Sequence, residues 1–351
     1  MSGLRNLFRG LFLSFASVLI TLAVMEAALR LFVHVTDDVE YQDLPGVGCA
    51  LRPGQSGRFI RSGGIDAQFR VNAEGWNAPR EYTKQRVPGR LRIAVVGDSF
   101  VEGMYVEQEQ LLSSVLERGL RKDGIDAEVY SFGVSGYGAS QVLHLVQRYV
   151  LDYSPDLIVY LFIRNDASDS CRCMEDKRWT QQYALGPDGA LEALPFKRYH
   201  MSMTKRALRK SALVRFFLYQ RRLLERFRDS SKQAAAETSA SPEGCRQDCW
   251  RIVGLLLQEL QGTLEAKHVP WLLAWEGDAN PDYARDERGR LEEIASTSGL
   301  PYRDLSPSFA AAARAGFRRY RYPGDGHWNA EGNRIAGEAL VPMVRALLEK
   351  P

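Results

Sequence analysis

Three residues that lie far apart in the chain carry the side chains needed for acyl transfer. Ser99 belongs to Gly97-Asp98-Ser99, directly after the apolar run 92–96, and Asp325 and His327 belong to Asp325-Gly326-His327-Trp328-Asn329 near the C-terminus. A serine hydroxyl becomes a good nucleophile only when a base removes its proton, and the base needs a third group that orients it. The three residues therefore predict a Ser-His-Asp site.

The carboxylate that orients His327 has two candidates. Asp325 lies two residues before the histidine, and residues two apart in an extended loop point to the same side, so its carboxylate would reach the ring. Asp304, which follows the predicted last strand, is the alternative. We favour Asp325.

Acyl transfer also needs hydrogen-bond donors that are already in place for the developing oxyanion. The candidates are the backbone N–H groups of Ser99 and Gly136 and the side-chain amide of Asn165. A glycine suits this role because no Cβ keeps the substrate away from its backbone. Arg164 is a candidate for contacting a carboxylate or phosphate of the substrate, and an ion pair with Asp166 or Asp169 is its alternative role.

The segments around these residues alternate between strand and helix patterns. The predicted strands are 92–96, 127–132, 156–162, 269–275 and 302–305, and the predicted helices are 107–121, 140–151, 250–264, 283–298 and 329–349. This order predicts a parallel sheet with right-handed crossovers and helices on both faces. Ser99, Gly136 and Asn165 follow the first three strands, so we expect them at the same edge of the sheet.

Four sequence blocks resemble those that define the SGNH (GDSL-like) hydrolase family. They are Gly97-Asp98-Ser99-Phe100, Gly136, Asn165-Asp166 and Asp325-x-His327, and the resemblance covers about residues 91–350. It implies a flavodoxin-like three-layer α/β/α sandwich and hydrolysis or transfer at carboxylic esters. It also implies Ser99 as nucleophile, His327 as base, Gly136 and Asn165 at the oxyanion, and no metal or organic cofactor.

Two positions depart from the family pattern. The family usually has its aspartate three residues before the histidine, where this chain has Gly324, and its third block often has a glycine where this chain has Ile163. These departures leave a second hypothesis open, a catalytically silent protein that binds or assembles polysaccharide on the same fold.

The N-terminus predicts a membrane anchor. Residues 11–25 are apolar and uncharged, and a helix over about 10–35 would be close to the roughly 20 residues that cross a bilayer. Arg5 and Arg9 precede it and four acidic residues lie between positions 37 and 43, so the short N-terminus is expected in the cytoplasm. A cleaved signal peptide is one alternative, but no small-x-small site follows Met25. A buried core helix is the other.

These patterns divide the chain into three parts. Residues 1–36 form a cytoplasmic tip and a transmembrane signal anchor, residues 37–90 form an extended membrane-proximal lead-in, and residues 91–351 form the hydrolase-like domain. The alternation stops at about 169–244, which is interpreted as a helical insertion in that domain.

A basic helix in the insertion suggests a partner. The basic amphipathic helix predicted at 204–228 could lie on anionic lipid, bind an anionic polysaccharide, or pack its apolar face on the main domain.

The five cysteines are Cys49, Cys171, Cys173, Cys245 and Cys249. Disulfides that flank the insertion are favoured over a metal site because no histidine stands at ligand spacing. The odd number leaves one thiol that is either unpaired or paired with another molecule.

Together the sequence predicts a single-pass, membrane-anchored serine esterase or O-acyltransferase in the periplasm or cell exterior. Acyl, above all acetyl, esters of an envelope or extracellular polysaccharide are the favoured substrates, although lipid or small acyl esters suit the same residues. The formal net charge is only +3 over 351 residues, which argues against a nucleic-acid partner.

Overall fold

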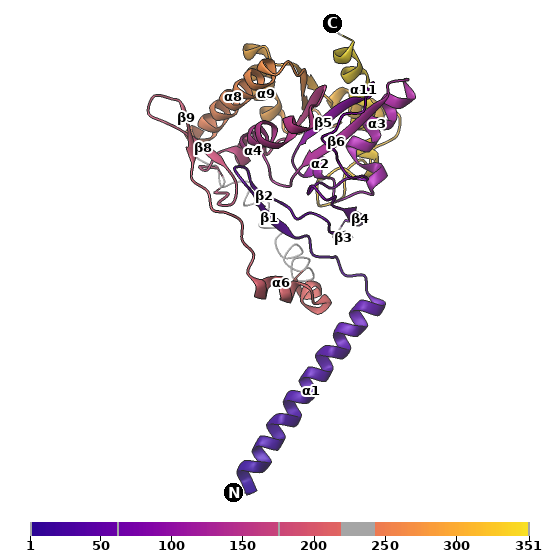
Figure 1. Cartoon of the computed structure of the whole chain (residues 1–351), viewed down its shortest axis with the longest axis vertical. Coiled ribbons are helices and arrows are strands. Elements are labelled where there is room, and N and C mark those ends of the chain that lie inside the picture. The colour runs from indigo at the N-terminus through magenta and orange to yellow at the C-terminus, as the bar shows by residue number, and fades with distance from the viewer. Residues whose placement is uncertain (1, 62, 175, 219–242, 350–351) are drawn as a thin grey trace.

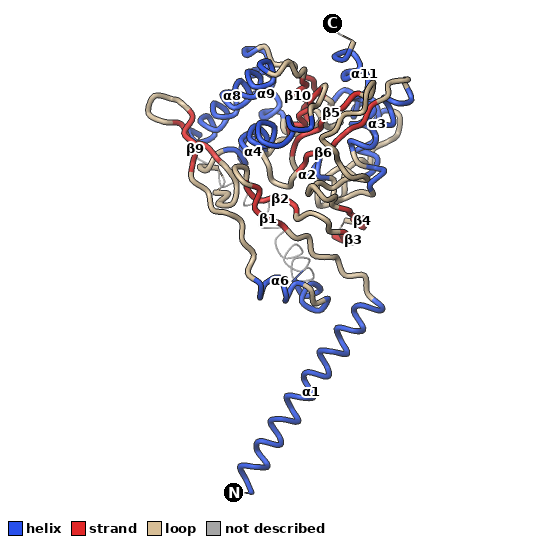
Figure 2. Tube along the Cα trace, viewed as in Figure 1, coloured by secondary structure: helices blue, strands red, loops and turns tan. Residues whose placement is uncertain are grey.

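A five-stranded parallel sheet forms the centre of the protein (Figures 1 and 2). The computed structural model describes residues 2–61, 63–174, 176–218 and 243–349. The strands lie in the order β11 (Tyr302–Asp304), β10 (Trp271–Trp275), β7 (Leu157–Phe162), β5 (Leu91–Gly97) and β6 (Ala127–Gly133). Every neighbouring pair is parallel, so the predicted α/β class with a parallel sheet is confirmed.

Helices cover both faces of this sheet because its strands are apolar on both sides. Ile93 and Val95 of β5 pack into one apolar cluster, whereas Ala94 and Val96 pack into the other. The first cluster includes residues of α3 (Leu112–Lys122), α10 (Ser306–Arg314) and α11 (Ala330–Leu348). The second includes residues of α4 (Ala139–Leu145), α8 (Glu243–Ala266) and α9 (Arg285–Ser298).

The chain changes direction across the sheet at β5. The first strand of the sheet, β5, has β6 on one side and β7 on the other, so the crossovers that leave β6 and β5 run toward opposite edges. Ligands of open parallel sheets bind at such a reversal, beyond the carboxyl ends of the strands. The short helix α2 (Ser99–Glu102) begins at this end of β5, and α5 (Asp166–Ser170) follows β7 there.

Several elements differ in detail from the sequence prediction. The helix expected at 107–121 begins only at Leu112, after a separate turn at Gln108–Gln110, and the helix expected at 140–151 widens after Leu145. Helix α10 was not predicted. The lead-in is more regular than expected and forms two hairpins, β1 (Tyr41–Leu44) with β2 (Gly48–Leu51) and β3 (Ser56–Arg61) with β4 (Ile65–Arg70).

The lead-in packs against the segment that follows α2. Phe59, Ile65 and Phe69 of the second hairpin form an apolar cluster with Met104 and Tyr105. Apolar burial of this kind is what holds two segments together in the absence of a continuous sheet. The lead-in is therefore part of the wall beside the carboxyl end of β5.

The insertion contains a hairpin, β8 (Gln182–Leu185) with β9 (Leu191–Leu194), and the helix α6 (Met203–Arg209). Two disulfides, Cys171–Cys249 and Cys173–Cys245, join its beginning to α8, which follows it. Cys49 is unpaired, as an odd number of cysteines requires. The pairing agrees with the predicted disulfides at the borders of the insertion.

The prediction of one continuous helix over 204–228 is wrong for the residues that the structure describes. Helix α6 ends at Arg209, and helix resumes at 212–218, while 219–228 lie outside the described residues. The break coincides with a contact between Ser211 and the N-terminal helix. The Ser211 hydroxyl accepts a hydrogen bond from the backbone N–H of Val214 and donates one to Glu26 of α1 (Ser2–Phe32), which starts a new helix there.

The predicted apolar N-terminal helix is present as α1, which projects from the body (Figure 1). Its stretch Gly3–Phe32 has a hydropathy of 2.1 in the most apolar window, and none of that window is buried. By length and composition this helix could cross a membrane, and a signal sequence near the N-terminus has the same character.

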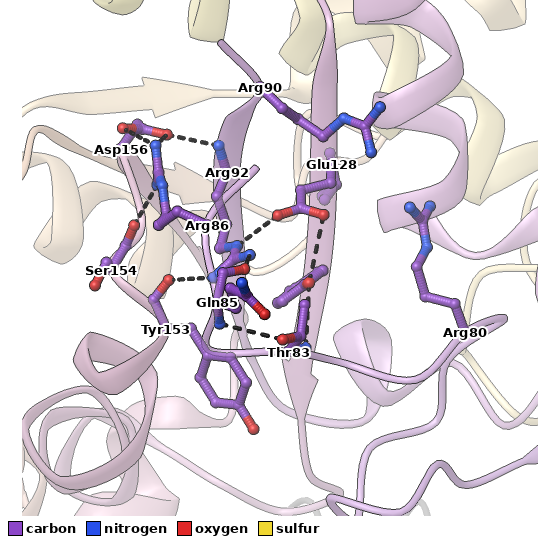
Figure 3. A network of polar contacts seen from close by, with 12 residues as sticks. Arg80, Thr83, Gln85, Arg86, Arg90, Arg92, Glu128, Tyr153, Ser154 and Asp156 are labelled. Atoms are coloured by element: carbon purple, nitrogen blue, oxygen red, sulfur yellow. Dashed lines mark hydrogen bonds and ion pairs between the residues drawn. The ribbon is translucent and has the colours of Figure 1, made fainter. Parts of the chain in front are cut away.

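A buried arginine connects the sheet to the lead-in (Figure 3). Arg92 of β5 is fully buried, and its Nε donates to Glu128 Oε1 of β6 at 2.6 Å. Its two remaining nitrogens donate to the carbonyl oxygens of Tyr153 and Gln85, at 2.6 and 3.0 Å. Each of the three guanidinium nitrogens thus has a hydrogen-bond partner, which offsets the cost of removing the charge from water.

Replacement of Arg92 by alanine is expected to lower the free energy of unfolding by about 3–5 kcal/mol, because the Glu128 carboxylate would remain buried without its cation. The double variant Arg92→Met, Glu128→Met should lose less. Urea unfolding followed by tryptophan fluorescence measures both. Lys84→Ala, which removes the exposed pair with Asp152, is the control and should cost less than about 1 kcal/mol. A double variant as unstable as Arg92→Ala would contradict this account.

Candidate active site

Ser99 is placed by a sharp turn between β5 and α2. A Cβ on Gly97 would lie 2.7 Å from Val101 Cγ2 and 2.9 Å from the carbonyl oxygen of Leu161, so only glycine suits the end of this strand. Asp98 then caps α2, because its Oδ1 accepts a hydrogen bond from the backbone N–H of Phe100 at 2.9 Å. The Ser99 side chain consequently stands at the carboxyl end of the sheet.

The imidazole of His327 lies between Ser99 and Asp325. Ser99 Oγ is 2.8 Å from His327 Nε2, and Asp325 Oδ1 is 2.5 Å from His327 Nδ1. The carboxylate selects the tautomer in which Nδ1 carries the proton, which leaves Nε2 free to accept the serine proton. Burial opposes ionisation of Asp325, but the hydrogen bond and charge of His327 hold the pKa of Asp325 below its usual 3.8.

The alternative carboxylate is engaged elsewhere. Asp304 Oδ1 accepts a hydrogen bond from the backbone N–H of Ser306 at 2.8 Å, and its other oxygen is 3.8 Å from Arg288. Of the two candidates, the structure brings only Asp325 to the ring of His327.

Two aromatic rings fix the orientation of the imidazole. Tyr105 stacks on His327 with ring centroids 3.9 Å apart, and Phe100 lies 5.0 Å from the same ring. The Tyr105 carbonyl also accepts a hydrogen bond from the Tyr322 hydroxyl, at 2.8 Å. The histidine loop is thereby joined to the segment after α2 by ring contacts and a hydrogen bond.

Arg321 was not found by sequence reasoning, although it holds the histidine loop in place. Its Nε donates to Asp278 Oδ2 at 2.8 Å, its Nη2 to Glu276 Oε2 at 3.0 Å and its Nη1 to the carbonyl oxygen of Gly326 at 2.6 Å. Burial opposes the charge of Arg321, but Glu276 and the other neighbouring anions raise its pKa above the ordinary value. Arg321 is one of three arginines within residues 318–321, and the sequence does not show which of them is buried and paired.

Gly136 and Asn165 are placed at the same edge, but the side-chain amide of Asn165 already has a partner. Gly136 adopts a φ of +78°, and its carbonyl oxygen accepts a hydrogen bond from Lys177 Nζ at 2.9 Å. Asn165 Nδ2 donates to Asp169 Oδ2 at 2.7 Å, and Asp169 pairs with the same Lys177 at 2.6 Å. The amide of Asn165 therefore points to Asp169 in this structure. The oxyanion role of both residues stays a prediction.

Among the described residues, Arg164 forms an ion pair with neither Asp166 nor Asp169. Its guanidinium lies over the ring of Tyr283, 5.6 Å from the centroid, and its backbone N–H donates to Glu276 Oε1. Asp166, one candidate partner, accepts a hydrogen bond from the Tyr160 hydroxyl at 2.6 Å. A substrate-binding role for Arg164 stays a prediction.

Two cavities border this edge of the sheet. One, of about 400 Å³, is lined by Gly136 together with Tyr41, Cys49, Ser135 and the insertion residues Asp176, Lys177, Arg178, Trp179 and Thr180. The other, of about 180 Å³, has Glu102 and Tyr105 in its wall. Both include Tyr41 and Ser135, so they meet at these two residues.

Residues 95–335 match the GDSL-like Lipase/Acylhydrolase family. This region is more than half of the chain, and it contains the serine block, the second and third blocks and the aspartate–histidine block. The chain therefore belongs to the GDSL-like (SGNH) lipase and acylhydrolase family, as the resemblance of its blocks implied.

Several solved structures are similar to this chain at low identity. A putative acylhydrolase from Bacteroides fragilis is 14% identical, with a TM-score of 0.38 over 74% of this chain and 88% of the other. A carbohydrate acetylesterase family member from Sinorhizobium meliloti is 15% identical, with a TM-score of 0.40 over 74% of this chain and 100% of the other. No curated protein matches the chain.

Asp98 predicts a pH-dependent stability. Burial raises the pKa of Asp98 to about 7 from its usual 3.8. Because the folded pKa is the higher one, its contribution to stability is fully present below pH 3.8 and is lost as the pH rises through about 7. The variant Asp98→Asn keeps an oxygen for the Phe100 N–H without the charge. Between pH 4 and 8, its melting temperature should fall by roughly 5 °C less than that of the wild type. Parallel curves would contradict the assignment.

Proposed function

We propose that the protein is a serine-dependent ester hydrolase or O-acyltransferase that acts outside the cytoplasm on acyl, above all acetyl, esters of a polysaccharide. The observation that carries this proposal is the hydrogen-bonded arrangement of Ser99, His327 and Asp325. Ser99 Oγ is 2.8 Å from His327 Nε2, and His327 Nδ1 is 2.5 Å from Asp325 Oδ1. Membership of an esterase and acylhydrolase family agrees with it.

The proposed reaction has two halves. Ser99 Oγ attacks the ester carbonyl carbon while His327 Nε2 takes its proton, and Asp325 stabilises the imidazolium. The oxyanion accepts hydrogen bonds from the backbone N–H groups of Ser99 and Gly136 and from Asn165, which must exchange Asp169 for the substrate. His327 then protonates the departing alcohol, and an acyl-serine remains. Water or a sugar hydroxyl, deprotonated by His327, attacks this ester and restores Ser99.

The larger cavity supports a sugar as the alcohol portion. It combines Trp179, which is 42% exposed, and Tyr41 with the polar groups of Lys177 and Thr180, beside Gly136. A flat aromatic surface next to hydrogen-bonding groups complements a sugar ring, which has an apolar face and a polar rim.

Covalent capture tests the proposed nucleophile. A fluorophosphonate probe should label the wild type at Ser99, and Ser99→Ala should abolish both labelling and the release of acetate from an acetylated polysaccharide. Acetylated glycan formed from an acyl donor faster than free acetate would assign a transferase rather than a hydrolase. An intact, folded protein that is never labelled would favour the silent polysaccharide-binding alternative.

Two aspartate variants provide a matched control for this test. Asp325→Asn should reduce the acetate release rate by about 10⁴-fold, because the amide no longer favours the productive tautomer of His327. Asp304→Asn should leave the rate within a few-fold of the wild type.

We further propose that α1 anchors the protein and that residues 203–218 lie at the membrane surface beside it. Glu26 of α1 accepts hydrogen bonds from Ser211 Oγ and from the backbone N–H groups of Ala212 and Leu213, at 2.7–2.9 Å. Arg30 of α1 donates to the carbonyl oxygen of Lys210 at 2.9 Å. A bilayer that surrounds α1 would therefore reach the segment 203–218 as well, in agreement with the position of α6 beside this end of α1 in Figure 1.

The side chains of this segment suit lipid better than polysaccharide. Met203 and Leu208 are 75% and 55% exposed. By contrast, Arg206, Arg209 and Arg215 pair with Glu40, Asp38 and Asp37 of the lead-in, which leaves these arginines less available for an anionic glycan. The apolar residues would enter the interface between headgroups and acyl chains.

Photo-crosslinking tests this placement. A benzophenone amino acid in place of Leu208 should crosslink the full-length protein to phospholipid in vesicles that contain phosphatidylglycerol. The same substitution of Asp188, in the turn between β8 and β9, should yield at least 10-fold less lipid adduct, because Figure 1 shows the β8–β9 hairpin away from α1. Equal adducts at both positions, or adducts of position 208 with polysaccharide alone, would contradict the proposal.

A further inference from the structure

We propose that the cavity beside Glu102 is a subsite for the sugar residue that carries the ester, and that the Glu102 carboxyl group binds a hydroxyl group of that sugar. This inference deepens the proposed function and rests on it. Glu102 was not among the residues that the sequence pointed to, and the acyl-transfer row does not use it.

Glu102 has an oxygen atom without a partner. The residue ends α2, three positions after Ser99, and is 2% exposed. Its Oε2 accepts a hydrogen bond from the Ser135 hydroxyl, whereas its Oε1 is buried and has no hydrogen-bond partner among the described residues. Buried polar atoms are nearly always paired in folded proteins, so this oxygen is suited to a partner that the chain itself does not supply.

The cavity that Glu102 lines is next to the catalytic imidazole. Tyr105 forms part of its wall, and the ring of Tyr105 stacks on His327 at 3.9 Å. Ser135, also in the wall, directly precedes Gly136 and is shared with the larger cavity. A ligand in this cavity would therefore be close to an ester that Ser99 attacks.

The walls are suited to a neutral polar ligand. The volume is about 180 Å³, and the lining joins the rings of Phe59, Tyr41 and Tyr105 to the polar groups of Glu102 and Ser135. Arg61, at the same cavity, has its guanidinium over the ring of Phe59, 4.6 Å from the centroid. Aromatic rings next to hydrogen-bonding groups complement a sugar ring, as proposed for the larger cavity.

A hydroxyl group is the partner that Glu102 would accept in either protonation state. Burial raises the pKa of Glu102 to about 7, so both forms are present near neutral pH. The carboxylate accepts a hydrogen bond, the carboxylic acid can donate one, and a sugar hydroxyl can both donate and accept. An alkyl chain would leave Oε1 unpaired, whereas a sugar hydroxyl would supply its missing hydrogen bond. The subsite would thus select sugar esters over lipid esters.

The test compares two acetyl esters of different alcohols. The substrates are 6-O-acetylglucose, which has free hydroxyl groups, and p-nitrophenyl acetate, which has none. Glu102→Leu should lower kcat/KM for 6-O-acetylglucose by about 10- to 100-fold, mainly through a higher KM, because a hydrogen bond to a charged group is lost. The kcat/KM for p-nitrophenyl acetate should stay within about 3-fold.

Two further variants separate binding from folding. Glu102→Gln retains a hydrogen-bonding group and should keep most of the activity on 6-O-acetylglucose. Glu109 is an exposed glutamate outside the cavity, and Glu109→Gln should leave kcat/KM unchanged for both substrates. Unchanged fluorophosphonate labelling of Ser99 and an unchanged melting temperature would show that Glu102→Leu folds. If it does not fold, Glu102→Ala takes its place in the comparison, with the same expected loss on 6-O-acetylglucose.

The outcomes distinguish this inference from the proposed function. Equal losses on both esters, or no loss on either, would overturn the subsite and leave the esterase intact. A wild type that neither captures the fluorophosphonate nor hydrolyses either ester would overturn the proposed function, and the subsite with it.

Discussion

The Arg321 guanidinium is the interaction on which the candidate site depends most. Ser99 and His327 are 228 positions apart, and the sheet places only the serine. Arg321 joins the carbonyl oxygen of Gly326, in the histidine loop, to Glu276 and Asp278, which directly follow β10. Glu276 is fully buried, so its pairing with Arg321 must persist for the fold to tolerate the charge. The histidine is consequently held against the same edge of the sheet that presents the serine.

Local sequence patterns were enough to predict the sheet and the acyl-transfer residues at its edge. The apolar runs at β5, β6 and β7 predict strands, and the parallel order predicts that residues at their carboxyl ends share one edge. The parallel order thus places Ser99, Gly136 and Asn165 at one edge, whereas Asp325 and His327 became candidates through their residue types and their resemblance to a family block. The contacts of Arg321 and Glu102 could not be predicted, because an arginine or glutamate has the same sequence appearance whether it is exposed or paired inside the protein.

Long-range contacts also explain the wrong helix at 204–228. The spacing of apolar and basic residues there is helical on both sides of Ser211, and nothing nearby interrupts it. The interruption comes from Glu26, 185 positions away, which accepts the Ser211 hydroxyl and the next backbone N–H groups. A local pattern cannot report a contact that forms only when the two segments have folded next to each other.

The lead-in connects α1 to the sheet and also contacts the segments beside the candidate site. The backbone at Gly63 approaches the carbonyl oxygen of Pro323 so closely that a Cβ would lie 2.5 Å from it, and Phe59 packs with Tyr105 in an edge-to-face contact. The segment that connects α1 to the sheet therefore forms part of the wall beside His327. Because the lead-in also pairs with the insertion through Arg209 and Asp38, a displacement of either segment relative to the sheet would change the shape of the cavity at Glu102. In this arrangement, residues of the lead-in that connects α1 to the sheet also shape the cavity beside Glu102.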